Sequence, residues 1–442
     1  MPICDLVGAR TFKIRSEKMT ENDVVLLEEK SKPMAESLER VMRELKPTMS
    51  LTIMLLRLAG KDKKLRSKLL EFIDVMPSLG GNRKKIRNHF RMYMDEHRHR
   101  FPVPYKQMLN VMNIPVVSLW CAGVMEWVIK NKFAPHFIIK DKDELFELSS
   151  LYSADNCGVM ADFLGEKVLT KKESEQFIRK YQEAMGWVDR GIVHVSVKPS
   201  SLYPFFEPEH YSLAKREAEV TLYGMFVSAF MQYNSRVTLD AEHYALRDLT
   251  EDVFCQVVSE LKISGCDNFG IAVQAYLKDS MGSAERFVGV AKKRGAPLMV
   301  RLVKGAYWDT EVEIANQNGW SVPVFENKEE TDRNFNRIAL YLLENSDYIR
   351  FYPATHNPKS IAFVYTAMNE LGLLNNNEFM NNFAYQVLYG LGESPRKALA
   401  QMHLPTLVYA PMGNLMEGMS YFARRILENT SNEGFLFTLV DE

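Results

Sequence analysis

Hydrophobic residues recur at helical spacing through the first third of the chain. Segment 34–76 places apolar residues three or four positions apart, and Pro47 and Gly60 interrupt the pattern. Segment 82–101 continues it, and neither stretch shows the alternation expected of a strand. The pattern predicts an N-terminal α-helical arm over residues 1–140.

From about residue 157 the pattern changes to short apolar runs, each followed by a polar stretch with helical spacing. Helices are expected between the runs, at 171–185, 283–295 and 359–372. Eight alternating units of strand and helix predict an α/β fold, a (βα)8 TIM-like barrel over residues 141–442, and an open doubly wound sheet is the alternative. The expected strands lie at 157–166, 192–200, 236–242, 269–277, 298–307, 350–357, 383–390 and 406–413.

Composition narrows the class of protein. The 442 residues are 46% hydrophobic and 25% charged, as in ordinary globular proteins. Lys and Arg total 55 against 56 Asp and Glu, so the basic excess of a nucleic-acid-binding protein is missing and no nucleic-acid partner is expected. Five scattered cysteines without a CxxC motif indicate unpaired thiols in a reducing compartment. No apolar run reaches the roughly 18 residues of a membrane-spanning helix.

Polar residues collect where the expected strands end. In a (βα)8 barrel the carboxyl ends of all strands meet at one rim, and chemistry takes place there. A packed barrel core has no use for so many polar groups, so this rim predicts a functional site. The residues concerned are Asp162, Glu166, Lys198, Asp240, Glu242, Gln274, Arg301, Lys304, His356, Asn357, Gln386 and Tyr409.

The segment "SYFARRILEN" at 420–429 predicts a helix with an unusual face. At helical spacing an aromatic ring, two guanidinium groups and a carboxylate lie on one side. Adjacent arginines can hold a substrate carboxylate from two directions, because each guanidinium is a planar fork. A solvated surface is the alternative, since most arginines on helices are exposed. The face consists of Tyr421, Arg424, Arg425 and Glu428.

Four motifs closely resemble those of the proline dehydrogenase family, including the proline dehydrogenase domain of bacterial proline utilization A. They are "VRLVKGAYWD" at 300–309, "ATHN" at 354–357, "YAPMG" at 409–413 and "YFARRILENTSN" at 421–432. The resemblance covers about 155–440 and extends loosely to the helical arm. It implies a distorted (βα)8 barrel with the final helix over its mouth. It also implies FAD as cofactor and oxidation of L-proline to Δ1-pyrroline-5-carboxylate.

The resemblance implies a substrate site built around the carboxylate of proline. Lys198 would join the arginine pair in binding that carboxylate, Asp240 would orient Lys198, and Glu166 would pair with Arg424 to close the site. The side chains expected around the ring are Tyr307, Leu388, Tyr409 and Tyr421. Those expected in catalysis are Lys198, Asp240, Tyr307 and Arg301. We also expect the cations around the substrate to disfavour the protonated form of its amine.

The resemblance also implies contacts to FAD, which would carry out the redox chemistry. Arg301 would lie near flavin N5, and Gln274 near the polar edge of the flavin ring. The pyrophosphate contacts would be Thr355, His356 and Asn357, and the remaining contacts Lys304, Gly305, Trp308, Lys328, Thr331 and Glu428. No metal is expected, because the "DAEH" segment at 240–243 alternates its side chains between two faces.

Three other functions remain open. They are a lyase or aldolase with a Schiff base on Lys198 or Lys304, a related flavin barrel acting on hydroxyproline or a folate, and a non-catalytic scaffold that binds partners through the arm. The resemblance implies a membrane quinone as electron acceptor. Since the chain ends soon after the arginine pair, we expect either a monofunctional enzyme, with a separate aldehyde dehydrogenase for the product, or an excised domain. It implies a cytoplasmic location with peripheral contact to the inner membrane, mitochondrial in a eukaryote.

Overall fold

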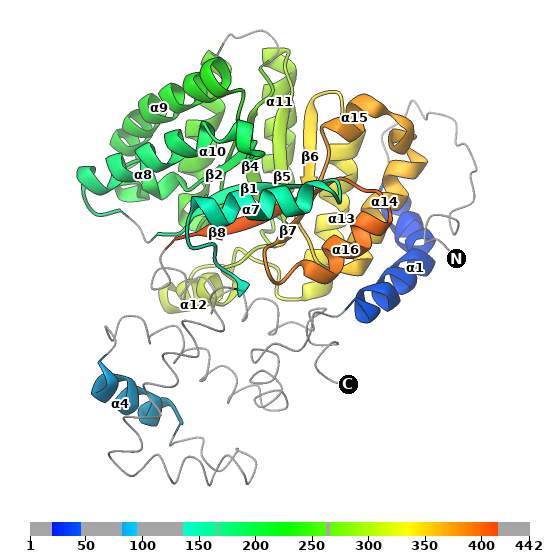
Figure 1. The fold of residues 1–442 in the computed structure, drawn as a ribbon, viewed down its shortest axis with the longest axis horizontal. Coiled ribbons are helices and arrows are strands. Elements are labelled where there is room, and N and C mark those ends of the chain that lie inside the picture. Colours follow the sequence, from blue (N-terminus) through cyan, green and yellow to red (C-terminus); the bar gives the residue numbers. More distant parts are fainter. Residues whose placement is uncertain (1–19, 46–81, 95–135, 166–167, 262–265, 414–442) are drawn as a thin grey trace.

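The computed structural model describes residues 20–45, 82–94, 136–165, 168–261 and 266–413. Within these ranges the chain forms an eight-stranded parallel sheet surrounded by helices (Figure 1). The strands are β1 (Cys157–Phe163), β2 (His194–Val197), β3 (Arg236–Leu239), β4 (Phe269–Gln274), β5 (Leu298–Val303), β6 (Ile349–Pro353), β7 (Tyr385–Leu388) and β8 (Thr406–Met412). All eight predicted strands are confirmed.

The strands follow one another around a nearly closed barrel. The sheet order is β6-β5-β4-β3-β2-β1-β8-β7, so β1 pairs with β2 on one side and with β8 on the other. At the remaining seam, β6 and β7 are joined by an isolated bridge between Ala354 and Gln386. The backbone N–H of Thr355 also donates to the carbonyl of Gln386 at 3.3 Å. The predicted (βα)8 barrel is therefore confirmed over the open sheet, and its distortion lies at this seam.

The helices predicted between the strands are present, and local sequence explains their ends. Thr170 and Glu173 form a reciprocal capping box at the start of α8. Gly295 ends α11 in the left-handed conformation, with a φ of +68°. The helices of the barrel are α7 (Lys142–Ser153), α8 (Lys171–Met185), α9 (Tyr211–Ser228), α10 (Tyr244–Glu260), α11 (Ser280–Arg294), α12 (Trp308–Asn318), α13 (Lys328–Glu344), α14 (Pro358–Glu370), α15 (Asn377–Asn381) and α16 (Glu393–Gln401).

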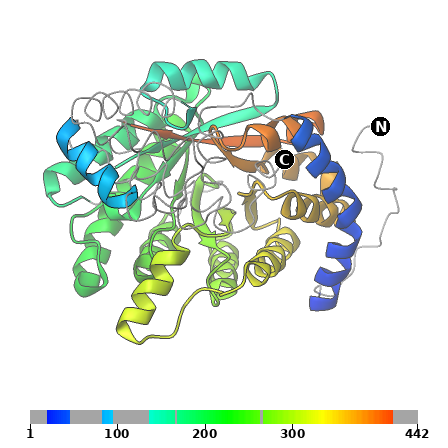
Figure 2. The ribbon, with the colours of Figure 1, turned by 90° about the horizontal axis from the view of Figure 1, so that it is seen from below.

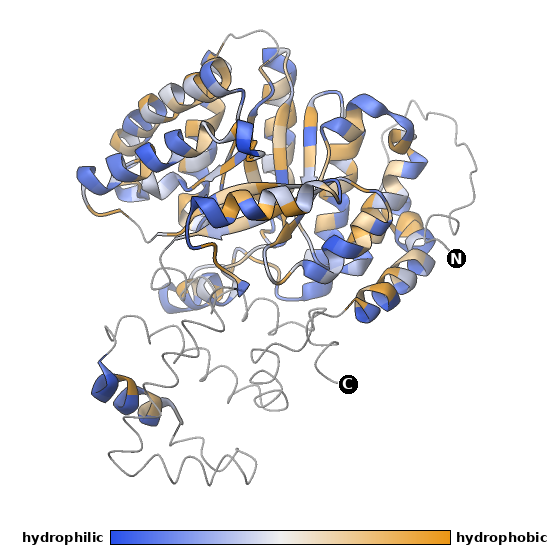
Figure 3. Cartoon of the chain, viewed as in Figure 1, coloured by the Kyte–Doolittle hydropathy of each residue, from blue (hydrophilic) through white to orange (hydrophobic). Residues whose placement is uncertain are grey.

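Side chains alternate between the two faces of each strand, and the two faces differ in chemistry. Outward residues such as Val159, Ile271 and Val300 pack with the helices in the main hydrophobic core. Figure 3 shows the corresponding division on the helices, which carry hydrophilic residues on their outer sides. The inward face holds a small apolar cluster of Met160, Met299, Tyr352, Leu407 and Tyr409. It also holds buried polar side chains, and these carry the candidate site.

The described parts of the predicted arm are helical, as α1 (Glu21–Glu44) and α4 (Arg83–Met94). Helix α1 lies along α13, α14 and α16, the helices beside the β6–β7 seam (Figure 2). Leu27 and Leu38 are buried in this contact, and Asn336 Nδ2 donates to Glu28 Oε1 at 2.9 Å. The domain division at residue 140 stays a prediction, and the predicted final helix lies outside the described residues. None of the described helices is long and apolar enough to cross a membrane.

Candidate active site

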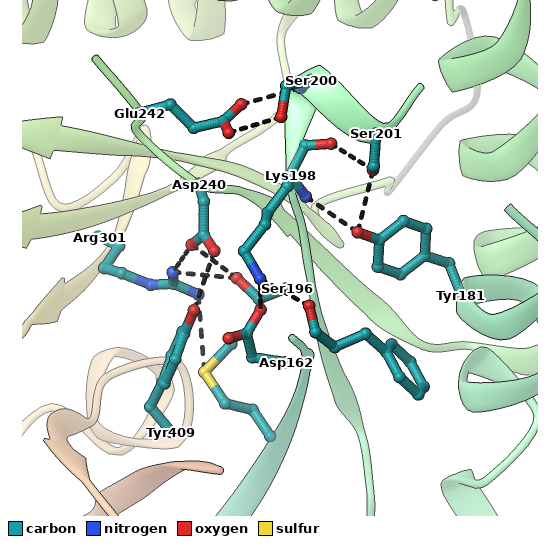
Figure 4. A network of polar contacts seen from close by, with 12 residues as sticks. Asp162, Tyr181, Ser196, Lys198, Ser200, Ser201, Asp240, Glu242, Arg301 and Tyr409 are labelled. Carbon is teal, nitrogen blue, oxygen red and sulfur yellow. Dashed lines mark hydrogen bonds and ion pairs between the residues drawn. The ribbon is translucent and has the colours of Figure 1, made fainter. Parts of the chain in front are cut away.

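The carboxyl ends of β1, β2, β3 and β5 bring two ion pairs together in the barrel mouth (Figure 4). Lys198 Nζ lies 3.0 Å from Asp162 Oδ1, and it donates to the carbonyl oxygen of Phe163 at 2.6 Å. Arg301 pairs with Asp240. Four polar residues from four strands thus meet on the inner face, as expected for the rim of a (βα)8 barrel.

Asp240 is the shared acceptor of the second pair. Its Oδ1 accepts from Arg301 and from Ser196 Oγ, the latter at 2.7 Å, and its Oδ2 accepts from Tyr409 OH at 2.9 Å. Arg301 is only 4% exposed, and its guanidinium carbon lies 5.2 Å from the centre of the Tyr409 ring. Its other terminal nitrogen contacts Met160 Sδ at 3.6 Å. Arg301 also donates to Ser196 Oγ at 3.1 Å, so contacts to residues of β1, β2 and β8 and to Asp240 after β3 hold it in one orientation.

Asp162 holds the first pair. Burial alone would lower the pKa of Lys198, but the negative charges of Asp162 and other neighbours outweigh burial and raise it. Burial raises the pKa of Asp162, and Asp240 adds to this while Lys198 opposes it. The prediction that Asp240 orients Lys198 therefore needs correction, since the carboxylate bonded to Lys198 is Asp162. The reason is register: Asp162 on β1 lies beside Ser196 on β2, and both oxygens of Asp240 are already engaged.

The backbone around Lys198 is also fixed. Tyr181 OH accepts from the Lys198 N–H at 3.3 Å, and Ser201 Oγ donates to the Lys198 carbonyl at 2.6 Å. A short 3-10 turn, Pro199–Ser201, follows directly. Lys198 therefore reaches the mouth from a rigid turn, with Asp162 as its counter-charge. Asp162 thus balances the charge of Lys198, and the expectation that the cations around the substrate disfavour the protonated form of its amine stays a prediction.

A second group of cations lies beyond β5 and β6. Lys304 pairs with Asp332 on α13. Burial lowers the pKa of Lys304, and the nearby amino groups of Lys328 and Lys359 lower it further, while Asp332 opposes the shift. These three lysines therefore gather near the amino ends of α13 and α14, where an anion such as pyrophosphate is favoured by helix dipoles as well as by charge. Sequence reasoning missed Lys359, which has no motif of its own.

The predicted pyrophosphate contacts form the turn between β6 and α14. Asn357 Oδ1 caps the helix by accepting from the N–H of Lys359 at 2.8 Å, and the Asn357 N–H donates to Thr355 Oγ1 at 3.1 Å. His356 Nε2 accepts from the N–H of Leu388 at 2.9 Å. This hydrogen bond thus joins the turn after β6 to the end of β7, at the predicted substrate contact Leu388.

The other predicted cofactor contacts surround the end of β4. Gly305 has a φ of +132°, and a Cβ there would lie 2.4 Å from the ring of Tyr276, so this tyrosine already requires glycine. Gln274 is buried and donates from Nε2 to the Glu242 carbonyl at 3.2 Å. Trp308 Nε1 donates to the Phe325 carbonyl at 2.8 Å. The remaining contact, Thr331, is buried on α13.

Several buried polar atoms of the inner face lack a hydrogen-bond partner among the described residues. They are Arg301 Nε, Asp162 Oδ2, and both side-chain polar atoms of Gln386. Buried polar groups are seldom left unpaired, so this inner face suits a further polar molecule. A guanidinium, an amide and a separate cluster of lysines form a donor set that fits the flavin ring and the pyrophosphate of FAD.

The "DAEH" residues diverge rather than converge. Glu242 accepts from the Ser200 N–H at 2.8 Å and from Ser200 Oγ at 2.6 Å, while His243 Nδ1 lies 3.4 Å from Glu311 Oε1. In the part of the chain that the structure describes, no group of three or more His, Cys, Asp or Glu side chains could hold a metal ion. The ring of His243 instead lies against the predicted site residue Tyr307.

The structure therefore brings Lys198, Asp240, Arg301 and Tyr409 into one connected region, with Leu388 packed against the inner apolar cluster. It adds the roles of Asp162 and Ser196. Asp162 was visible as a polar residue at a strand end, but its pairing depends on strand register. The predicted residues Glu166, Tyr421, Arg424, Arg425 and Glu428 lie outside the described residues.

The chain is similar to known proteins of the family that its sequence motifs resemble. Bifunctional protein PutA of Escherichia coli K12 is 29% identical over 295 residues, covering 63% of this chain and 22% of that protein. Proline dehydrogenase 1 of Bacillus subtilis 168 is 27% identical over 277 residues, 62% of this chain and 79% of that protein. The chain thus spans less than a quarter of the PutA relative.

A solved structure of proline utilization A from Bdellovibrio bacteriovorus, inactivated by N-propargylglycine, has a TM-score of 0.77 at 30% identity. The similarity covers 93% of this chain and 42% of that one. The family model for the proline utilization A N-terminal domain matches residues 27–124. The proline dehydrogenase model matches residues 147–438, the whole barrel, and the chain therefore belongs to the proline dehydrogenase family.

Proposed function

We propose that this protein is an FAD-dependent proline dehydrogenase that oxidises L-proline to Δ1-pyrroline-5-carboxylate, the first step of proline catabolism. The proposal rests on two ion pairs, Lys198–Asp162 and Arg301–Asp240, whose carboxylates are buried in the barrel mouth of a member of this family. One cation can bind a substrate carboxylate, and the other can stabilise negative charge that develops on a reduced cofactor.

The inner face and the lysine cluster would hold FAD. Bound FAD would accept a hydride at N5 and pass its electrons to a membrane quinone. Arg301 and Gln274 would contact the flavin ring, and Lys304 and Lys328 would balance the charge of the pyrophosphate. The other proposed contacts are Gly305, Trp308, Thr331, Thr355, His356, Asn357 and Glu428.

The substrate would be oriented by its carboxylate. Lys198 would bind it together with Arg424 and Arg425, and Asp162 keeps Lys198 protonated for that role because it raises the pKa of the amine against burial. Glu166 would pair with Arg424 over the bound substrate. The ring would pack against Tyr307, Leu388, Tyr409 and Tyr421. Asp240 contributes by fixing Arg301 and the hydroxyl of Tyr409.

The same geometry disfavours a Schiff-base mechanism at Lys198. A Schiff base requires a neutral amine, usually in an apolar pocket or beside another cation. The pKa of Lys198 is instead raised, because the charges of Asp162 and its other neighbours outweigh the effect of burial. The pKa of Lys304 is lowered, but Asp332 engages its amino group in an ion pair.

The chemistry of the product suggests the next partner. Δ1-pyrroline-5-carboxylate opens in water to an aldehyde, which a separate aldehyde dehydrogenase would consume. Transfer of electrons to a membrane quinone would bring the protein to a membrane surface. We therefore propose a cytoplasmic protein with peripheral contact to the inner membrane, mitochondrial in a eukaryote.

An absorption spectrum tests cofactor and substrate together. The purified protein should show flavin bands, and these should bleach when proline is added without oxygen. A colourless protein that does not take up added FAD would overturn the cofactor assignment. A yellow protein that proline does not bleach, but another substrate does, would overturn only the substrate.

The arginine pair can be tested separately. Arg424→Met or Arg425→Met should raise the proline KM by tens to thousands of fold while FAD stays bound. Removing one partner of a desolvated charge pair weakens binding by roughly 2 to 5 kcal/mol. Arg216→Met is a matched control, since Arg216 lies on the outer helix α9 with its side chain 70% exposed. Wild-type proline binding in both variants would show that the predicted helix face is only surface.

A further inference from the structure

Two turns at the carboxyl rim meet through a pair of rings. His243 lies directly before α10, after β3, and Tyr307 lies directly before α12, after β5. Their ring centres are 4.2 Å apart, with the planes inclined at 44°. Tyr307 is one of the side chains proposed to pack against the substrate, whereas no substrate or cofactor contact has been assigned to His243.

Glu311 ties the same two turns together. It lies in the first turn of α12 and is only 5% exposed. Its Oε1 accepts from the N–H of Tyr244 at 2.8 Å and lies 3.4 Å from His243 Nδ1. Its own N–H donates to the carbonyl of Tyr307 at 2.9 Å. A buried carboxylate thus places the start of α12 against the start of α10, which brings the two rings into contact.

The backbone on the other side of Tyr307 is fixed as well. Trp308 packs with Tyr276 and Val324, and its Nε1 donates to the Phe325 carbonyl at 2.8 Å. The Tyr307 side chain of this turn lies against the His243 ring. The His243 ring covers part of that side chain and so restricts its rotation.

We propose that His243 is a positioning residue that keeps the Tyr307 ring oriented for contact with the substrate ring. The inference rests on the proposed proline dehydrogenase function. His243 acts through Tyr307 and does not itself touch the substrate. It should therefore influence substrate affinity more than the rate of hydride transfer.

Substitution of His243 separates these two effects. His243→Ala should raise the proline KM about three- to tenfold, the effect of losing one aromatic contact, and should change kcat by less than about twofold. His243→Phe keeps a ring and should retain the wild-type KM. His210→Ala is the matched control, because His210 also precedes a helix and its ring lies 5.4 Å from that of Phe205, which is no proposed site residue.

A double substitution tests whether the effect passes through Tyr307. In a Tyr307→Ala background, His243→Ala should cause no further rise in KM. An equal rise in both backgrounds would mean that His243 acts by another route, and would overturn the proposal. If His243→Ala does not fold, His243→Asn has no ring and carries the same prediction.

Hydrogen exchange supplies a readout that does not depend on activity. Amides of residues 304–311 should exchange faster in His243→Ala than in the wild type or in His210→Ala. If proline fails to bleach the wild-type flavin, the proposed function fails, and exchange still tests the ring contact. If the wild type is active but His243→Ala has unchanged KM and exchange, the positioning role alone is refuted.

Discussion

The two ends of the barrel interior are both polar, but they satisfy their charges differently. At the carboxyl end, Lys198 and Arg301 each face a buried carboxylate. At the amino end, Arg236 donates to neutral groups, to Tyr352 OH at 3.0 Å and to Asn382 Oδ1 at 3.3 Å. The cations of the carboxyl end are therefore matched by buried carboxylates, whereas at the amino end Arg236 is matched by neutral acceptors and Arg350 pairs with the half-buried Asp267 at 3.3 Å.

His194 belongs to the amino end. It is fully buried, its Nε2 lies 2.5 Å from Thr238 Oγ1, and its ring is 5.7 Å from that of Tyr352. Burial lowers its pKa well below the usual value, and the charges of Arg301 and Arg236 lower it further. His194 is thus neutral between two guanidinium groups, and adds no charge to this end of the barrel.

This difference between the two ends distinguishes residues needed for function from residues needed for stability. A buried ion pair often stabilises a fold no better than packed apolar residues of the same volume, because both charges must be desolvated. Stability therefore does not explain two such pairs at the carboxyl end, whereas the proposed binding of a carboxylate beside a flavin would. At the amino end, the proposed function requires only a well-packed and rigid barrel interior. Substitutions at the carboxyl end should thus disturb catalysis, and those at the amino end only folding.

The largest effect is expected for Asp240→Ala. The substitution removes the common acceptor of Arg301, Ser196 and Tyr409 and leaves a buried guanidinium without its counter-charge. The free energy of unfolding should fall by about 3 to 5 kcal/mol, and flavin reduction by proline should slow strongly. Denaturant titration and anaerobic stopped-flow absorbance measure the two quantities.

Asp155→Ala is the matched control for that prediction. Asp155 also pairs with a buried guanidinium, that of Arg396, but its side chain is 47% exposed and Arg396 keeps Glu393 as a partner. We expect a loss of less than about 1 kcal/mol and normal flavin reduction. Similar losses of stability and rate in both variants would show that Asp240 has no special role.

At the amino end, Arg236→Met should lower stability and spare catalysis. It removes hydrogen bonds to Tyr352 and Asn382 that involve a charged donor, so the free energy of unfolding should fall by about 1.5 to 3 kcal/mol. The proline KM and kcat of the folded variant should stay within about twofold of wild type, because no group in the mouth loses a partner. A large rise in KM would mean that the two ends are coupled, and the comparison would fail.

The sequence predicted the barrel well because its signal is local. Each of the eight strands is a short apolar run followed by helical spacing, and the rim rule alone placed Lys198, Asp240, Arg301 and Tyr409 together. Which carboxylate pairs with Lys198 could not be read from the chain. Asp162 and Asp240 are both acidic residues at strand ends, and only the register of β1 against β2 distinguishes them.

Other details depended on contacts between distant segments. Gly305 was expected to contact the cofactor, and nothing in the sequence indicated that the ring of Tyr276 lies where its Cβ would be. Lys359 looked like an ordinary helix residue until the fold brought it near Lys304. The amino-end network has no motif at all, because Arg236, Tyr352 and Asn382 meet only after the barrel closes.

A pH series should detect the neutral histidine of the amino end. His194 has a lowered pKa when folded, so at pH 5 the unfolded chain binds a proton that the folded chain does not. His194 therefore makes its full contribution to the free energy of unfolding above the unfolded pKa of about 6.5. As the pH falls to 5, roughly 2 kcal/mol of that free energy is lost.

His194→Gln removes the titrating imidazole, and the glutamine side chain can still hydrogen-bond to Thr238. The difference in unfolding free energy between wild type and variant should therefore shrink by about 2 kcal/mol between pH 7 and pH 5. Parallel pH curves for the two proteins would mean that His194 is protonated inside the fold. Flavin reduction at pH 7 should be the same in both, as expected for a residue of the amino end.

The smallest effect is expected for Tyr409, where the two regions meet. Tyr409 packs in the inner apolar cluster, and its hydroxyl donates to Asp240 Oδ2 at 2.9 Å. Tyr409→Phe removes this hydrogen bond and keeps the ring, so kcat/KM for proline should fall by no more than about tenfold, equivalent to roughly 1.4 kcal/mol. We expect the Tyr409 ring to crowd a 4-hydroxyl group, so the wild type should prefer proline over trans-4-hydroxyproline, and Tyr409→Phe should keep that preference because its ring remains. Tyr409→Ser removes the bulk as well and should narrow that preference. Equal use of both substrates by the wild type, or a lost preference in Tyr409→Phe, would show that the bulk of Tyr409 does not set specificity.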